Sequence, residues 1–124
     1  MYKAVLNGNM QNIIDFNKSI NINWEKQGKH IICSKYYIEG KSILTADPER
    51  IIKLHAGNGK KYITNNGSYK NKESFIHNKI IGIWKNEQGK QSKTNRGTIH
   101  YSKTGAHIVP SMPISKLPLE EEQN

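Results

Sequence analysis

The chain has 124 residues, with hydrophobic residues at 35% and a formal net charge of +9 from 19 basic and 10 acidic side chains. This length leaves room for one domain with one modest core. No run approaches the roughly 20 apolar residues of a membrane-spanning helix. No apolar secretory segment begins the chain, so any export signal is expected in another part of a longer protein.

The basic excess indicates a polyanionic partner. Three acids cluster at residues 120–122, and without them 19 basic side chains face seven acidic ones, a net charge of +12 over residues 1–119. Such an excess attracts nucleic acids and speeds association with them, although a Lys-rich solvated surface is the simpler alternative. Only Arg50 and Arg96 are arginines, which favours Lys contacts to phosphate over readout of base edges.

The first half of the chain predicts a linker, a β-prone stretch and one clear helix. Residues 1–21 are Asn-rich and are interpreted as a linker from upstream sequence. Residues 31–45 are apolar and rich in Ile and Tyr, a composition that favours strands.

The helix falls within residues 46–59. Asp47 is placed to cap its N-terminus, Pro48 suits the first helical position, and Gly57 is able to close the C-terminus in a left-handed conformation. Side chains at helical spacing are predicted to share the edge that faces the core, and these are Ile51, Leu54 and His55.

The second half predicts a loop followed by strands. Residues 57–74 are rich in Gly, Lys and Asn and are interpreted as a long loop. A strand is predicted at 79–85, a turn at 86–89 and a hairpin at 97–110, before an extended tail over 114–124. This order of elements predicts an α+β fold with a mostly antiparallel sheet.

The hairpin is where candidate chemistry becomes visible. Thr104-Gly105 is predicted to form its two-residue turn, which pairs Ser102 with His107 and His100 with Val109. Because side chains alternate along a strand, one face of the hairpin is apolar and the other is polar. The polar face is predicted to hold Thr98, His100, Ser102 and His107, and the apolar face Ile99, Tyr101 and Ile108. A solvent-exposed polar face is the alternative to a binding surface.

These residue types suit RNA cleavage without a metal ion. Such cleavage needs a base for the proton of the ribose 2′-OH, an acid for the departing 5′-oxygen and a cation beside the phosphate. Histidine suits both proton steps because its pKa lies near 6.5, and Lys103 at the turn supplies a cation.

The sequence offers little for metal chemistry. The acids outside the tail stand singly, whereas a two-metal nuclease needs several carboxylates together. The histidines lack cysteine partners at zinc-ligand spacing, and Cys33 is the single cysteine, interpreted as a packing residue. We therefore expect no metal and no other cofactor. His77, at a junction of loop and strand, is interpreted as a surface residue.

Four segments together carry a resemblance to a known family. KQGKHI (26–31), LHAGNGK (54–60), IIGIW (80–84) and IHYSKTGAHIVP (99–110) resemble the polymorphic toxin type fifty domain, over about residues 22–113. That family occurs at the C-termini of bacterial polymorphic toxins, including those with an LXG export domain. The resemblance implies a ribonuclease with the fold of barnase, EndoU, colicin-type tRNases and RelE. That fold places an N-terminal helical part on a four- to five-stranded antiparallel sheet.

The resemblance also implies site residues. By motif, these are His30 with Lys26 or Lys29, then His55, and then Ser102, Lys103 and His107. The catalytic candidates are His30, His55, Ser102, Lys103 and His107. The RNA-binding candidates are Lys26 and Lys29, to which we add Lys60 and, from the polar face of the hairpin, Thr98 and His100. We assign His30 as base and His107 as acid, roles that are open to reversal. His55 has an alternative role as a partly buried structural residue.

The leading hypothesis is therefore a metal-independent endoribonuclease toxin, acting as a monomer. A non-catalytic RNA-binding module and a DNA nuclease toxin are the alternatives. We expect the producer to secrete it within a larger protein, the target to be RNA in the cytoplasm of another cell, and an acidic immunity protein to neutralise it. No membrane partner is expected.

Overall fold

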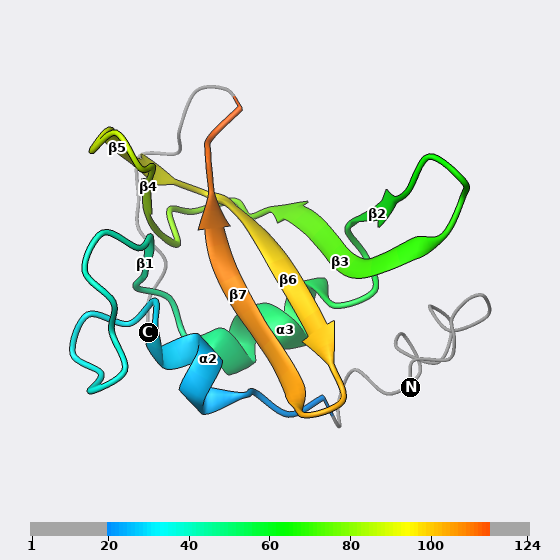
Figure 1. The fold of residues 1–124 in the computed structure, drawn as a ribbon, viewed down its shortest axis with the longest axis horizontal. Coiled ribbons are helices and arrows are strands. Elements are labelled where there is room, and N and C mark those ends of the chain that lie inside the picture. The colour runs from blue at the N-terminus through cyan, green and yellow to red at the C-terminus, as the bar shows by residue number, and fades with distance from the viewer. Residues whose placement is uncertain (1–19, 115–124) are drawn as a thin grey trace.

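Two antiparallel sheets and two short helices make up residues 20–114, the part of the chain that this computed structural model describes (Figure 1). Most of the predicted linker and tail, residues 1–19 and 115–124, therefore lies outside the described residues. The helices are α2 (Trp24–Gly28) and α3 (Pro48–His55). The strands are β1 (Ile43–Leu44), β2 (Lys60–Ile63), β3 (Tyr69–Ile76), β4 (Gly82–Lys85), β5 (Gln91–Thr94), β6 (Arg96–Ser102) and β7 (Gly105–Ser111).

The larger sheet has four strands in the order β2-β3-β6-β7, and the smaller has three in the order β1-β4-β5. The α+β class with antiparallel pairing is confirmed, but the expected single sheet is wrong. The chain passes from β5 to β6 through one residue, Asn95. There the fully buried Thr94 donates its hydroxyl to the carbonyl oxygen of Ser111 at 2.6 Å. This contact fixes the corner at which the chain leaves one sheet for the other.

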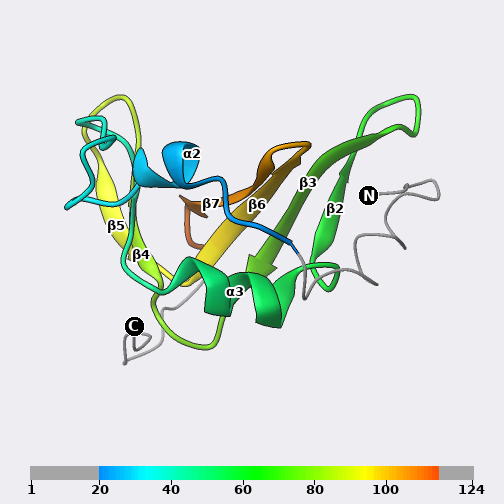
Figure 2. The same ribbon diagram turned by 90° about the horizontal axis from the view of Figure 1, so that it is seen from below.

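The core lies between α3 and the larger sheet. In Figure 2, α3 lies across the face of β3 and β6. Ile51 and Ile52 of the helix are buried in one cluster with Phe75, Ile99 and Ile108. Because α3 covers this face, the opposite face of the larger sheet carries the side chains that alternate with the core residues.

The helix α3 has the predicted ends. The Asp47 side chain accepts a hydrogen bond from the backbone N–H of Glu49, Pro48 opens the helix, and Gly57 follows it at φ 86°. The inward position of Leu54 is wrong, since that side chain is 46% exposed. The sheet packs instead on the side of the helix that carries Ile51 and Ile52.

Four other local expectations are also wrong. Cys33, interpreted as a packing residue, is exposed. Residues 57–74 include β2 and most of β3, whose Lys-rich composition hides the strand pattern. Within 31–45 only Ile43–Leu44 forms a strand, because the preceding turns leave their apolar side chains exposed. His77 is 5% exposed rather than on the surface, because its ring packs edge-on against His55.

Candidate active site

The β6–β7 hairpin is confirmed, with a register that differs from the predicted one. His100 pairs with His107, and Ser102 pairs with Gly105, so the turn is Lys103-Thr104 rather than Thr104-Gly105. Gly105 has φ 126° and begins β7, where a Cβ would lie 2.8 Å from the carbonyl oxygen of Asn21. Glycine is therefore required by the chain that crosses beside it. The shift spans an even number of residues, so the predicted polar and apolar faces are unchanged.

Three imidazoles gather on the open face at this hairpin. The rings of His100 and His107 stack with centroids 4.8 Å apart and planes 21° apart. His30, from the segment after α2, also stacks with His107, with the two centroids 6.3 Å apart and the planes 15° apart. We call His30, His100 and His107 the histidine stack. Two of its members lie opposite each other on paired strands, and the third comes from 70 residues earlier in the chain.

The ring of His30 is fixed by the protein. It is 8% exposed, and its Nδ1 lies 2.9 Å from the carbonyl oxygen of Ser42. A carbonyl only accepts, so Nδ1 carries the hydrogen and donates it. In the neutral ring, Nε2 is then the nitrogen with the free electron pair, which is the form needed for a general base.

Buried hydrogen bonds anchor α2 beside the stack. Gln27 is fully buried, donates its amide to the carbonyl oxygen of Ile108 at 3.0 Å and accepts from the N–H of Ile108 at 2.8 Å. Asn23 caps the helix by accepting from Lys26 N–H, and its side chain donates to the hydroxyl of Thr104. These bonds fix α2, with Lys26 and Lys29, along β7.

The environment keeps the imidazoles neutral. Burial lowers the pKa of His100 to about 4, with further lowering from Lys72, His30 and Lys26. Burial likewise lowers the pKa of His107 to about 4, and the nearby His100, His30, Lys26 and Lys29 add to it. The pKa of His30 is also lowered by burial, against a raising effect of the Ser42 hydrogen bond, with smaller lowering from Lys41 and Lys29. The three imidazoles are thus neutral bases with several lysine ammonium groups nearby.

The other predicted residues of the hairpin and β2 share the open face or its rim. Thr98 lies two residues before His100 on β6, and its hydroxyl is 2.8 Å from that of Ser111. Ser102 donates to the carbonyl oxygen of Gly105 at 2.9 Å, and Lys103 is exposed in the turn. Lys60 pairs with Ser74, which in turn pairs with Thr98, so Lys60 belongs to the same face.

His55 is not brought together with the stack. Its ring stacks on Phe75 at 4.5 Å, and its Nε2 lies 2.9 Å from Nδ1 of His77. Phe75 points into the core on β3, whereas His100 points to the open face of β6. The contacts of His55 therefore belong to the α3 side of the sheet.

The motif LHAGNGK (54–60) also packs on the core side. The buried carboxylate of Glu73 accepts from Gly57 N–H at 2.7 Å and from Gly59 N–H at 2.8 Å. It accepts a further short hydrogen bond from the Tyr101 hydroxyl. A Cβ at Gly59 would lie 2.2 Å from the carbonyl oxygen of Ser74, so the turn packs directly on β3.

Sequence reasoning missed Lys72 as a member of the site. It pairs with His100 across β3 and β6, and therefore presents its ammonium group to the same face. No signal pointed to it, because residues 57–74 were interpreted as a loop. Lys41 was missed as well, and it approaches His30 only because the chain between α2 and β1 folds back.

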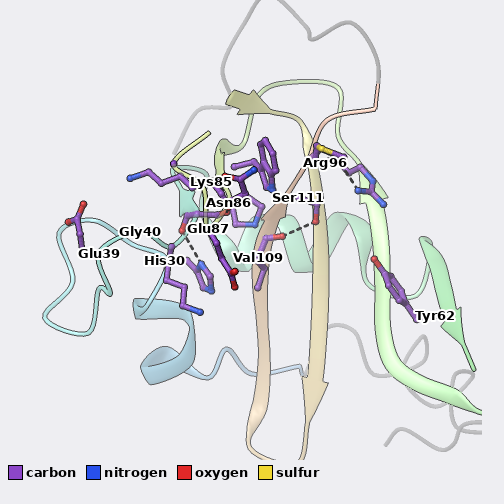
Figure 3. A pocket seen from close by; sticks show the side chains of 16 residues that line it. His30, Glu39, Gly40, Tyr62, Lys85, Asn86, Glu87, Arg96, Val109 and Ser111 are labelled. Carbon is purple, nitrogen blue, oxygen red and sulfur yellow. Dashed lines mark hydrogen bonds between the residues drawn. The ribbon is translucent and has the colours of Figure 1, made fainter. Parts of the chain in front are cut away.

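A cavity of about 820 Å³ opens beside the stack, and His30 forms part of its wall. Figure 3 shows His30, Lys85, Asn86 and Glu87 on one side of β7, and Tyr62 on the opposite side beyond β6. Trp84 also lines it, and Val109 and Ser111 of β7 lie within it. The cavity is therefore continuous with the open sheet face that carries the imidazoles.

Residues 20–114 contain neither a metal-binding cluster nor a membrane-spanning helix. No group of three or more His, Cys, Asp or Glu side chains there has an arrangement that holds a metal ion. No helix in that range is both long and apolar enough to cross a membrane.

The model of one protein family, bacterial toxin 50 (Ntox50), matches residues 22–110. The chain belongs to the bacterial toxin 50 family. This match confirms the resemblance drawn from the four motifs and identifies a bacterial toxin domain. The match begins at Ile22, which pairs with Ala106 of β7, and ends at Pro110, one residue before the end of the histidine-bearing hairpin. None of the curated proteins matches the chain.

Proposed function

We propose that this bacterial toxin domain is a metal-independent endoribonuclease whose active centre is the histidine stack. The observation that carries the proposal is the close approach of three imidazoles, with centroids 4.8 and 6.3 Å apart, on an open sheet face bordered by lysines. Neutral imidazoles accept protons, and ammonium groups attract and hold a phosphodiester.

The chemistry requires a 2′-hydroxyl. His30 Nε2 takes the proton of that hydroxyl, and the oxygen attacks the adjacent phosphorus. The bond from phosphorus to the 5′-oxygen breaks, and an imidazolium returns a proton to the leaving oxygen. The products are a 2′,3′-cyclic phosphate and a free 5′-hydroxyl. DNA lacks the attacking group, so RNA is the substrate that fits.

The acid step depends on the substrate. An imidazole with a pKa of about 4 is almost entirely neutral at pH 7. A bound phosphodiester places a negative charge beside the stack and favours the protonated ring. His107 stacks with both other rings, which makes it the best placed to share its proton with the phosphate. His100 stacks against it as a second candidate for this role.

The lysines hold the phosphate. Lys26 comes from α2, Lys29 from its C-cap and Lys72 from β3, so they approach the stack from two sides. Lys60, Thr98, Ser102 and Lys103 lie farther along the same face or at its end, where they contact the RNA backbone. In this arrangement His55 has a structural role.

The decisive experiment is cleavage of a short RNA in excess EDTA. We expect cleavage of the RNA, none of the matching DNA, and loss of at least about 100-fold in rate for His107→Gln, within the usual contribution of a general acid. Circular dichroism should show that the variant is folded. A requirement for added Mg²⁺ would overturn the mechanism.

The same experiment separates the alternatives. RNA binding without cleavage would indicate a non-catalytic binding module, and cleavage of DNA would indicate a DNA nuclease toxin. An RNA substrate with a single 2′-deoxy position at the cut site should resist cleavage there, which tests the attack by the 2′-hydroxyl directly.

We further propose that the domain is delivered within a larger secreted protein, acts as a monomer in the cytoplasm of a target cell and is neutralised by an acidic immunity protein. The support is the family and the charge of +9. Expression in bacteria should arrest growth, and His107→Gln should relieve the arrest. Strong growth with active wild-type protein alone would contradict this proposal.

A further inference from the structure

The cavity beside the histidine stack has a position that suits the base of the bound nucleotide. His30 belongs to both the stack and the cavity wall. Along β7, Val109 is two residues and Ser111 four residues beyond His107. At about 3.3 Å per residue, the cavity begins roughly 7 Å from His107 and extends to roughly 13 Å. One nucleoside spans that interval when its phosphate lies at the stack.

The lining suits the face of a planar ring. Trp84 lies on the wall formed by β4 and Tyr62 on the wall formed by β2, while Val109 supplies apolar surface between them. Aromatic side chains of this kind stack on unpaired RNA bases, and each stacked base contributes about 1–3 kcal/mol of binding. The volume of about 820 Å³ lies within the usual range for small-molecule sites.

A carboxylate in this basic cavity needs an explanation other than phosphate binding. Two carboxylates, Glu39 and Glu87, line it together with Lys85 and Arg96. Glu87 is the one in the turn that directly follows the strand of Trp84. The turn that carries Glu87 is closed by the Asn86 side-chain oxygen, which accepts from the N–H groups of Gln88 and Lys90 at 2.9 Å each. The backbone at Glu87 is thus fixed, and the negative charge of its exposed side chain repels phosphate. It is suited to accept hydrogen bonds from N–H groups of a base.

A carboxylate pairs best with two N–H groups that point the same way. Among the four RNA bases, guanine alone presents a ring N–H and an amino group side by side on its pairing edge. Adenine and cytosine present one amino group each, beside a ring nitrogen that accepts. An accepting nitrogen opposite a carboxylate is repelled.

We propose that the cavity is a guanine subsite, in which Trp84 stacks on the base and Glu87 accepts from its pairing edge. This inference rests on the proposed function, because it places the attached phosphate at the histidine stack. It makes the toxin select RNA positions next to guanine.

The test uses Trp84 as the reporter. The chain has two tryptophans, and Trp24 is half exposed on α2, so Trp24→Phe leaves Trp84 as the single indole. Fluorescence titrations in this background use 2′-deoxy dinucleotides, which cannot be cut: GpA, ApG, ApA and CpC. We expect quenching of Trp84 and binding of GpA or ApG about 5- to 100-fold tighter than ApA, the range of a bidentate pair.

Two matched variants test the role of Glu87. In the same background, Glu87→Gln should bring GpA, ApG and ApA to within about 2-fold of one another. Glu49→Gln makes the same charge change on the α3 side of the sheet and should keep the preference for guanine. Equal binding of all four probes, unchanged Trp84 fluorescence or a preference that survives Glu87→Gln would each overturn the subsite.

The outcome is separable from that of the ribonuclease proposal. RNA cleavage in EDTA without any preference for guanine would remove the subsite and leave the nuclease. Guanine-dependent quenching without cleavage would support the subsite and remove the nuclease, leaving a protein that binds RNA.

Discussion

The buried carboxylate of Glu73 offers the sharpest test of how this fold is held together. One oxygen accepts from Gly59 N–H at 2.8 Å, and the other accepts from Gly57 N–H at 2.7 Å and from the Tyr101 hydroxyl. The side chain is fully buried. It therefore joins the turn after α3 to strands β3 and β6, directly behind the pair formed by Lys72 and His100.

Glu73→Gln replaces one acceptor with an amino group that faces a backbone donor. The least costly orientation turns the new amino group toward Gly59. In this orientation the hydrogen bond from Gly59 N–H to the carboxylate is lost, which costs about 1.5–3 kcal/mol because the acceptor was charged. The new amino group and Gly59 N–H are then two buried donors that face each other, which adds a further loss of about 1–3 kcal/mol. The relief of a buried charge offsets part of this loss. We expect a net loss of about 2–4 kcal/mol in the free energy of unfolding.

The assay is urea denaturation at pH 7 together with thermal melting. For a domain of this size the melting temperature should fall by about 8–30 °C. Tyr101→Phe removes one of the three donors and should cost about 1–2 kcal/mol. Glu49→Gln, an exposed matched control on α3, should cost less than about 1 kcal/mol. A loss for Glu73→Gln no larger than that of the control would refute the reasoning.

Three further predictions concern the histidine stack and its supports. NMR titration should give pKa values of about 4 for His100 and His107, and Lys26→Met should raise both. Because unfolded imidazoles take up protons near pH 6.5 and the folded ones only near 4, stability should fall as the pH drops through that window; a flat profile would contradict the burial of the rings. His55→Asn should lower the melting temperature but retain cleavage per folded molecule, whereas loss of cleavage at unchanged stability would return His55 to the catalytic set. Gln27→Ala leaves the buried N–H and C=O of Ile108 without their partner and should cost about 2–4 kcal/mol in urea denaturation. It should also weaken RNA binding, because α2 and its C-cap carry Lys26 and Lys29.

Local patterns predicted the elements whose signals are contained in adjacent residues. The ends of α3 depend on Asp47, Pro48 and Gly57, each of which acts on the backbone within a few positions. The polar and apolar faces of β6 and β7 follow from a period of two. That period survives an error of register by an even number of residues, so His100 and His107 were assigned to the same face despite the misplaced turn.

The sequence did not predict strand β3, and the reason is equally local. Its outer face carries Lys72, Ser74 and the exposed Ile76, and only Glu73 and Phe75 face the core. A buried carboxylate in an apolar position breaks the alternation that identifies a strand. Its partners, the N–H groups of Gly57 and Gly59, are supplied from a turn that the strand pattern does not contain.

The sequence by itself determined the α+β class, the capped helix, the histidine-bearing hairpin, the excess of positive charge and, through its motifs, the toxin family. Tertiary structure alone decided which side chains meet. His30 reaches His107 because Gln27 fixes α2 along β7, Lys72 joins because β3 pairs with β6, and His55 is separated because α3 covers the other face. The physical reason is range: capping and alternation act between neighbours in the chain, whereas a site built from residues 30, 72, 100 and 107 exists only once distant segments have packed.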